Sequence, residues 1–249
     1  MKKELEHFIY SQNSINTYKS CPRKFKLKYI ENLNWKKDDI NSKEYYEGLI
    51  TGSEFHLICE RYFENIPLGI DKENNETFYT WIQNIKKILP IENNKIYLPE
   101  YEVRMNINKS IISAKYDLVI IDKDNIEIWD WKTENKQLEY KNLINRMQTI
   151  VYMFIAKEVI PKINNLDSTY ENISMKYYQP QFGNNAITIN YTEEIHEENR
   201  ESIKKYIEFI NNSEFNFRNN NHCKYCEFNK LCNNEEVIYE QLEEEIYER

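Results

Sequence analysis

The spacing of apolar residues along the chain changes near residue 90. Before this point, apolar positions recur at the spacing of an amphipathic helix, and Pro90 is a stop signal. Ser14 is the predicted N-cap of the first helix, and Pro22 is an expected irregularity inside it. The helices predicted for this part of the chain cover residues 15–30, 42–63 and 77–89.

After residue 90 the pattern becomes typical of strands, with Ile, Val, Tyr and Trp in short runs. The strands predicted here cover residues 95–107, 110–121, 125–131, 173–179 and 186–191. Between and after these strands, helices are expected over residues 138–159, ending at Pro161, and 193–211. A cysteine-rich loop and an acidic terminal helix follow.

This order of elements predicts one α/β domain over residues 1–249, because no repeat or low-complexity linker divides it. The expected parts are a helical N-terminal segment (1–90), a mixed sheet core (95–191), a helix with the cysteine loop (192–232) and an acidic helix (233–249).

Composition excludes several classes of protein. Hydrophobic residues make up 41% of the 249 residues and charged residues 30%, which is typical of globular proteins. The longest apolar stretch, residues 149–156, is far shorter than the roughly 20 residues of a membrane span. The first residues lack the apolar core of a secretory signal, so a cytoplasmic location is expected. The five cysteines are then predicted to be metal ligands or free thiols.

The net charge of −8 is unevenly distributed. The last sixteen residues contribute −6, and the rest of the chain −2. Residues 19–37 contain seven basic residues and one acidic residue. A basic segment on a nearly neutral body can bind a polyanion locally.

The most informative segment is AKYDLVIIDKDNIEIWDWKTENK, residues 114–136. A tight turn at Lys123–Asp124 would pair these strands as an antiparallel hairpin, in a register that sets Asp117 opposite Asp130 on one sheet face. Lys132 follows Asp130 by two positions and is expected on the same face.

Opposed carboxylates on a half-buried face need a cation between them. Lys132 is one candidate and a divalent metal is the other. Oxygen ligands from two aspartates suit Mg²⁺ or Mn²⁺, either of which can generate a hydroxide nucleophile. The alternative is a solvated hairpin end with an ordinary Asp–Lys ion pair.

This D-(x)12-D-x-K hairpin resembles the core of the PD-(D/E)xK nuclease superfamily. GSEFH (residues 52–56), QTIVY (148–152) and SINTYKSCPRKFKLKYI (14–30) resemble motifs of its RecB-like branch, which includes CRISPR-adaptation nucleases. Ala114 stands where the branch usually has Gly. The resemblance implies a restriction-endonuclease-like fold that cleaves DNA with Mg²⁺ or Mn²⁺.

The resemblance also implies roles for individual residues. His56, Asp117, Asp130 and the backbone carbonyl of Trp131 would bind the metal. Lys132 would orient the attacking water and stabilise negative charge on the phosphate. Gln148 would position substrate or lysine, and Tyr152 would contact DNA.

Structural roles are the alternatives for three of these residues. His56 could pair with Glu60 one helical turn later, Tyr152 could be a core residue, and Gln148 lies between apolar residues.

HCKYCEFNKLC places Cys223, Cys226 and Cys232 on one loop. Four thiolates would complete a zinc site or an iron–sulfur centre, and the spacing does not decide between them. The resemblance selects Cys21 as the fourth ligand and implies a [4Fe–4S] cluster, with zinc as the alternative. Cys59 lies inside a predicted helix and is expected to be a buried apolar residue.

If Cys21 joins the loop, Arg23 and Lys24 beside it would form a basic patch suited to phosphate contacts. The leading hypothesis is therefore a metal-dependent deoxyribonuclease, either an exonuclease that acts on single-stranded or frayed DNA ends or an endonuclease, with a helicase or integrase as its candidate protein partner. The alternatives are a non-catalytic nucleic-acid-binding or assembly subunit and a zinc-bound interaction module.

Overall fold

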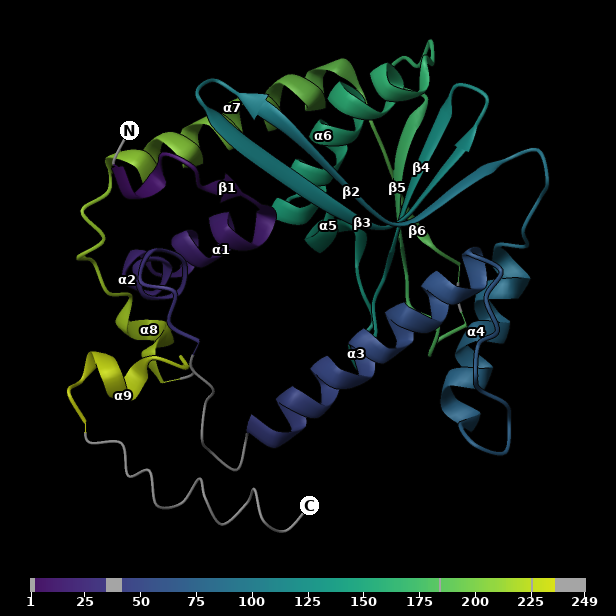
Figure 1. Ribbon diagram of the computed structural model, residues 1–249, viewed down its shortest axis with the longest axis horizontal. Helices are drawn as coiled ribbons and strands as arrows, with labels where there is room; N and C mark the ends of the chain where they lie inside the picture. The colour runs from purple at the N-terminus through teal and green to yellow at the C-terminus, as the bar shows by residue number, and fades with distance from the viewer. Residues whose placement is uncertain (1–2, 35–41, 184, 225, 236–249) are drawn as a thin grey trace.

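A mixed six-stranded sheet lies at the centre of the computed structural model, which describes residues 3–34, 42–183, 185–224 and 226–235 (Figure 1). The strands are β1 (Ile9–Tyr10), β2 (Ile96–Ile107), β3 (Ser110–Asp122), β4 (Asn125–Trp131), β5 (Ile173–Tyr178) and β6 (Ile187–Asn190). β3 pairs antiparallel with β2 along one edge. Its other edge pairs with β1 in parallel and with β4 antiparallel. β5 runs parallel to β4, and β6 is antiparallel to β5.

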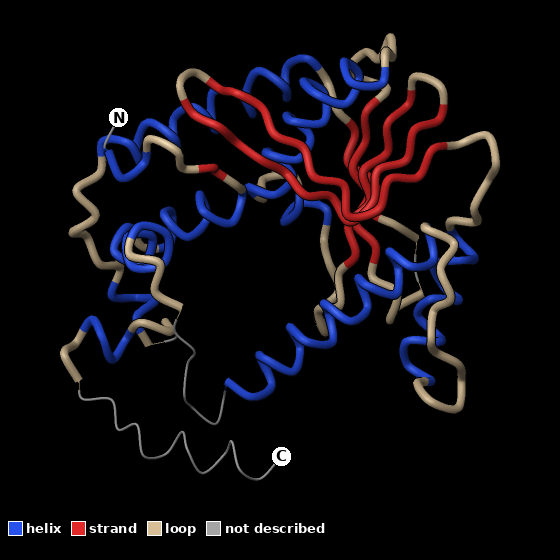
Figure 2. Tube along the Cα trace, viewed as in Figure 1, coloured by secondary structure: helices blue, strands red, loops and turns tan. Residues whose placement is uncertain are grey.

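Helices cover both faces of this sheet (Figure 2). The helices are α1 (Gln12–Ser20), α2 (Pro22–Phe25), α3 (Ser42–Phe63), α4 (Glu76–Ile88), α5 (Tyr140–Leu143), α6 (Met147–Asn164), α7 (Glu193–Asn212), α8 (Asn220–Cys223) and α9 (Asn229–Cys232). A 3-10 turn, Lys3–Leu5, precedes β1, and one π-helical turn, Lys26–Ile30, follows α2. The predicted mixed α/β core with flanking helices is thus confirmed.

Two hydrophobic cores lie on the two sides of the sheet. On one side, α1, α6 and α7 pack over β3, β4 and β5, with buried residues such as Ile15, Val151 and Ile203. On the other side, α3 and α4 pack through residues such as Phe55 and Ile82. α6 is apolar nearly all round because it lies between the sheet and α7.

α2 and the segment that carries α8 and α9 lie side by side, at the left of Figure 1. The backbone N–H of Arg23 donates to the carbonyl of Phe217 at 3.1 Å. Lys24 pairs with Glu227 at 2.6 Å. α1 and α2 are therefore anchored to the segment that carries α8 and α9.

The first helical segment differs from its prediction. Ser11, not Ser14, is the N-cap of α1, because Ser11 and Ser14 form a reciprocal capping box. The helix ends at Ser20, and Pro22 begins the short helix α2, where its missing N–H is tolerated. β1 was not predicted.

The helix predicted over residues 138–159 is also corrected. Only the turn α5 forms before Met147, and α6 then passes through Pro161 to Asn164. Asn165, in the left-handed conformation with φ 53°, ends it. The acidic helix predicted over 233–249 lies outside the described residues beyond Glu235. None of the described helices combines the length and apolar character needed to cross a membrane.

Candidate active site

The β3–β4 hairpin has the predicted register, but its ladder stops short of the two aspartates. Asp122 pairs with Asn125, and the last rung is Leu118–Trp129. Beyond it, Oδ2 of Asp117 accepts the backbone N–H of Trp131 at 2.8 Å. The side chain of Asp117 therefore takes the place of the next backbone acceptor, at the point where the two strands separate.

The prediction that Asp117 and Asp130 share one sheet face needs correction. Tyr116 and Val119 lie in the same core although they are three positions apart, so the alternation of faces breaks between them. Asp117 consequently approaches His56 of α3, whereas Asp130 contacts Gln148 of α6. The two carboxylates reach the end of the hairpin from opposite layers.

His56 is held between two oxygen atoms. Its Nδ1 lies 3.4 Å from Oδ1 of Asp117, and its Nε2 lies 3.1 Å from the carbonyl oxygen of Trp131. Burial lowers the pKa of His56, but the contact with Asp117 and the charges of Asp117 and Asp130 outweigh this effect, so the pKa is raised. A neutral imidazole has only one N–H and cannot donate to both oxygens. The arrangement thus favours a positive charge here, from a proton or a metal ion.

A glycine lets α3 approach the hairpin closely enough for these contacts. A Cβ atom built at Gly52 would lie 3.3 Å from Oγ1 of Thr133, a tight contact in the loop after β4. Because Gly52 and His56 are one helical turn apart on the same face, close approach at Gly52 brings His56 to the end of β4. This explains the GxxxH spacing physically.

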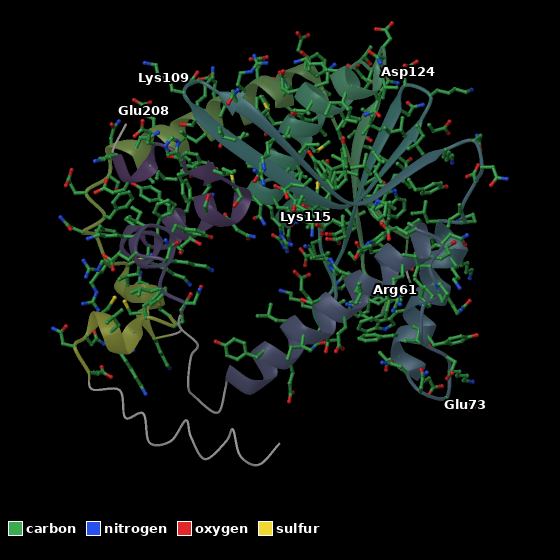
Figure 3. The ribbon with its side chains drawn as sticks, viewed as in Figure 1. Arg61, Glu73, Lys109, Lys115, Asp124 and Glu208 are labelled. Atoms are coloured by element: carbon green, nitrogen blue, oxygen red, sulfur yellow. The ribbon has the colours of Figure 1, made fainter. Side chains whose placement is uncertain are left out.

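Glu100 is a candidate site residue that was not predicted from the sequence. Ligand atoms of His56, Glu100 and Asp117 all lie within 4.8 Å of one another. Glu100 stands across from Asp117, between the rungs Pro99–Leu118 and Tyr101–Tyr116. Its backbone has a φ of 49°, which marks an irregularity in β2. Nζ of Lys115, a residue labelled in Figure 3, lies 2.6 Å from Oε2 of Glu100 and forms an ion pair with it.

Asp130 forms the second half of the site and is only 1% exposed. Its Oδ1 accepts a hydrogen bond from Nε2 of Gln148 at 2.6 Å. Its Oδ2 lies 2.7 Å from Nζ of Lys132 but makes no aligned hydrogen bond. Desolvation raises the pKa of Asp130 to about 6, even though Lys132 lowers it. The ammonium group of Lys132 thus lies directly against Oδ2 of Asp130.

Lys132 stays charged despite its burial. Desolvation lowers its pKa, but Asp130 and Asp117 outweigh this effect and raise it. Its ammonium group is therefore held at the junction of the two aspartates.

Two cavities meet at Lys132 and Glu134. One, of about 660 Å³, lies along α3 and is lined by His56 and Glu100 among others. The second, of about 510 Å³, lies along α1 and the start of α6 and is lined by Gln148 among others. Lys132 thus lies between two cavities that are open to a ligand.

Three further residues were predicted to contact DNA, and they lie in two different parts of the structure. These residues are Tyr152, Arg23 and Lys24. Tyr152 is 7% exposed, and its ring packs edge-on against Tyr116 while its hydroxyl hydrogen-bonds with Gln148. It therefore supports Gln148 from the core and offers little surface to a ligand. Arg23 and Lys24 lie instead on α2, beside the cysteine loop.

Cys21 lies beside the segment that leads into the cysteine loop. Sγ of Cys21 lies 3.8 Å from the carbonyl of Phe217, and Asn219 donates to the carbonyl of Ser20 at 3.0 Å. Burial raises the pKa of Cys226, and the nearby Glu227 and Cys232 also raise it. Within the described residues, no three cysteine sulfurs lie within 4.8 Å of one another.

One family comparison and one solved structure agree with this architecture. The sequence pattern of the PD-(D/E)XK nuclease superfamily matches residues 9–233. A solved structure from Eubacterium rectale, described as a "putative exonuclease", has a TM-score of 0.52 at 13% identity, covering 94% of this chain and 90% of that one. The solved protein SSO0001 has a TM-score of 0.40 at 16% identity, with coverages of 95% and 90%. A search of curated proteins found no match.

Proposed function

Because this chain belongs to the PD-(D/E)XK nuclease superfamily, we propose that it is a deoxyribonuclease of the RecB-like branch that hydrolyses phosphodiester bonds with Mg²⁺ or Mn²⁺. The observation that carries the proposal is the convergence of His56, Glu100 and Asp117 beside the Asp130–Lys132 pair. A bound divalent ion would polarise the phosphate and activate a water molecule.

Three clustered side chains fit such an ion, and one further carboxylate and one carbonyl lie beside them. His56, Glu100 and Asp117 offer one nitrogen and two carboxylate ligands. The carbonyl of Trp131 lies 3.1 Å from His56, and Oδ2 of Asp130 is buried beside Lys132. A nitrogen ligand among oxygens favours Mn²⁺ over Mg²⁺.

Lys132 and Gln148 have supporting roles in this proposal. The ammonium of Lys132 is fixed by Asp130, so it can stabilise negative charge that develops on a phosphate and orient the attacking water. Gln148 holds the other oxygen of Asp130. Tyr152 contacts Gln148 from the core, and we propose that it acts through that residue rather than on DNA directly.

We also propose that Cys21, Cys223, Cys226 and Cys232 hold a [4Fe–4S] cluster. The contacts between the Cys21 segment and the loop support a shared centre. In a cubane cluster each thiolate binds a different iron atom, so the sulfurs lie further apart than on zinc. The role of the centre would be structural, because it joins α1 and α2 to the end of the described chain. A helicase or integrase partner stays an expectation from the resemblance.

An assay with end-labelled DNA tests the proposed activity. Single-stranded and duplex substrates are incubated with Mn²⁺, Mg²⁺ or EDTA, and the products are resolved by length. We expect cleavage only with a divalent ion, and Lys132→Ala should reduce kcat by about 100-fold or more while leaving Mn²⁺ affinity nearly unchanged. Parent protein that binds DNA but never cuts it would instead support a non-catalytic binding subunit.

A further inference from the structure

Strand β2 has one long edge that pairs with no other strand in the part of the chain that the structure describes. The strand is twelve residues long, and its other edge pairs with β3. Strand β6, at the opposite end of the sheet, has only four residues. An open edge presents a row of unpaired N–H and C=O groups, and a short edge strand keeps that row small. β2 is therefore the edge better suited to accept another strand.

The turn of the β2–β3 hairpin determines which backbone groups face the open edge. Ile107 and Ser110 close a two-residue turn, so they form a pair that exchanges hydrogen bonds. Because the direction of the backbone groups alternates along a strand, those of Glu102, Arg104 and Asn106 point away from β3. Among the described residues, none forms a backbone hydrogen bond with these groups. These three residues therefore offer hydrogen bonds to a further strand.

The features that protect an edge strand from pairing lie in the first part of β2. Pro99 has no N–H, and Glu100 has a φ of 49°, which interrupts the extended backbone. Residues 101–107 have neither feature. The segment open to regular pairing is therefore the second half of the strand, next to the hairpin turn.

The charges of this segment are complementary to themselves. Glu102 and Arg104 are exposed, and a nitrogen of the Arg104 guanidinium lies 2.8 Å from Oε1 of Glu102. If a second copy pairs antiparallel about Val103, Glu102 of each copy lies directly opposite Arg104 of the other. Opposite charges in such a cross-strand position are stabilising. Pairing centred on Glu102 or on Arg104 would instead set like charges face to face, so the charges select one register.

The other face of the segment is complementary in the same register. Val103 is buried, and Tyr101 and Met105 are partly buried against the core that contains α6. Pairing about Val103 sets Tyr101 of each copy opposite Met105 of the other. Contacts between a thioether and an aromatic ring are favourable. Both faces of the strand thus support the same pairing.

We infer that β2 is a self-association edge, which pairs antiparallel with β2 of a second copy about a two-fold axis at Val103. Such an interface is isologous, since the same patch of both copies forms it. It would join two six-stranded sheets into one continuous sheet. The inference is independent of the proposed function, because Glu102, Val103 and Arg104 have no part in the proposed chemistry.

Sedimentation velocity of the full chain tests this inference without any nucleic acid or metal. The parent protein should change from monomer to dimer between about 1 and about 100 µM, a range that suits a small interface. Glu102→Arg and Arg104→Glu should each weaken self-association by about tenfold or more, because each sets like charges opposite one another.

Mixing the two variants provides the decisive measurement. Every opposed pair across the strands of a mixed dimer is again Arg with Glu, so we expect the mixture to dimerise with the Kd of the parent. One variant carries a fluorescent label and is titrated with the other. This rescue also shows that both variants are folded. Glu201→Arg is the matched control, since it reverses an exposed charge of α7 that pairs with Lys204 at 2.8 Å. It should associate like the parent.

A parent protein that stays monomeric up to about 100 µM would overturn the inference. So would a dimer that both charge reversals leave unchanged, or single variants that fail to associate and are not restored by mixing. Cleavage assays do not enter any of these outcomes, so a failure of the proposed function would leave the result intact.

Discussion

Asp117 accepts the backbone N–H of Trp131 through Oδ2 at 2.8 Å, so one side chain serves both the sheet and the candidate metal site. Its other oxygen lies 3.4 Å from His56. The same residue therefore fixes the separation of β3 from β4 and presents a carboxylate to α3. Stability and activity should respond differently to its replacements.

Asp117→Ala should destabilise the protein by about 1–3 kcal/mol, because it leaves the N–H of Trp131 without its acceptor. Asp117→Asn should cost much less, since an amide oxygen can accept the same hydrogen bond. Urea unfolding of the two variants without metal measures the difference. Equal loss of stability in both variants would show that this hydrogen bond does not matter to the fold.

Glu100→Gln should weaken Mn²⁺ binding by about 10-fold or more, because it removes one carboxylate of the cluster while keeping the shape of the side chain. Glu102→Gln is the control, since Glu102 lies two positions further along β2 and pairs with Arg104 at 2.8 Å. Isothermal titration with Mn²⁺ compares them. If both variants bind Mn²⁺ like the parent, Glu100 is not a ligand.

Metal affinity should fall as pH falls. The pKa of Asp130 is raised to about 6 and that of His56 is raised above its usual value, so both groups hold protons that an ion must displace. The apparent Kd for Mn²⁺ should rise at least about tenfold between about pH 7.5 and about pH 5.5. His56→Gln should flatten this dependence. A Kd that does not change with pH would contradict the protonation states described above.

The raised pKa of Asp130 has the opposite effect on the stability of the metal-free protein, which should increase as pH falls. Because the folded chain holds the proton of Asp130 more tightly than the unfolded chain, this contribution to stability is complete below about pH 4 and is lost as pH rises through about 6.

Cys21→Ser should lower the iron content, the visible absorbance and the melting temperature together, because it would remove one ligand of a centre that joins both ends of the described chain. Cys59→Ser is the matched control. Cys59 is 1% exposed in the core between α3 and the sheet, so its replacement should lower the melting temperature modestly and leave iron unchanged. A Cys21→Ser protein with full iron content would exclude Cys21 as a ligand.

The sequence predicted the hairpin well because a two-residue turn determines the pairing of every rung outward from it. The turn at Lys123–Asp124 gave the register of β3 and β4 correctly. The expected alternation of β3 side chains between the two faces of the sheet breaks at Asp117, where β3 and β4 separate. The same counting from the Asn108–Lys109 turn would have set Glu100 opposite Asp117, which is the signal that was missed.

Other differences come from contacts that local sequence does not contain. β1 is only two residues long and is defined by its pairing with Ile111 and Ile112, about a hundred positions away. The capping box of Ser11 and Ser14 places the start of α1 three residues earlier than a single N-cap residue suggests. Tyr152 is buried because its ring packs against Tyr116 of β3, a contact between distant parts of the chain.

Cleavage by Asp117→Asn tests the central claim most directly. This variant should keep the fold, as circular dichroism can verify, while losing the charge that the proposed metal site needs. Asp122→Asn, at the turn end of β3, is its matched control. With end-labelled single-stranded DNA and Mn²⁺, we predict that Asp117→Asn cuts at least about 100-fold more slowly than the parent and that Asp122→Asn cuts at the parent rate. A folded Asp117→Asn protein that cuts DNA as fast as the parent would contradict the account.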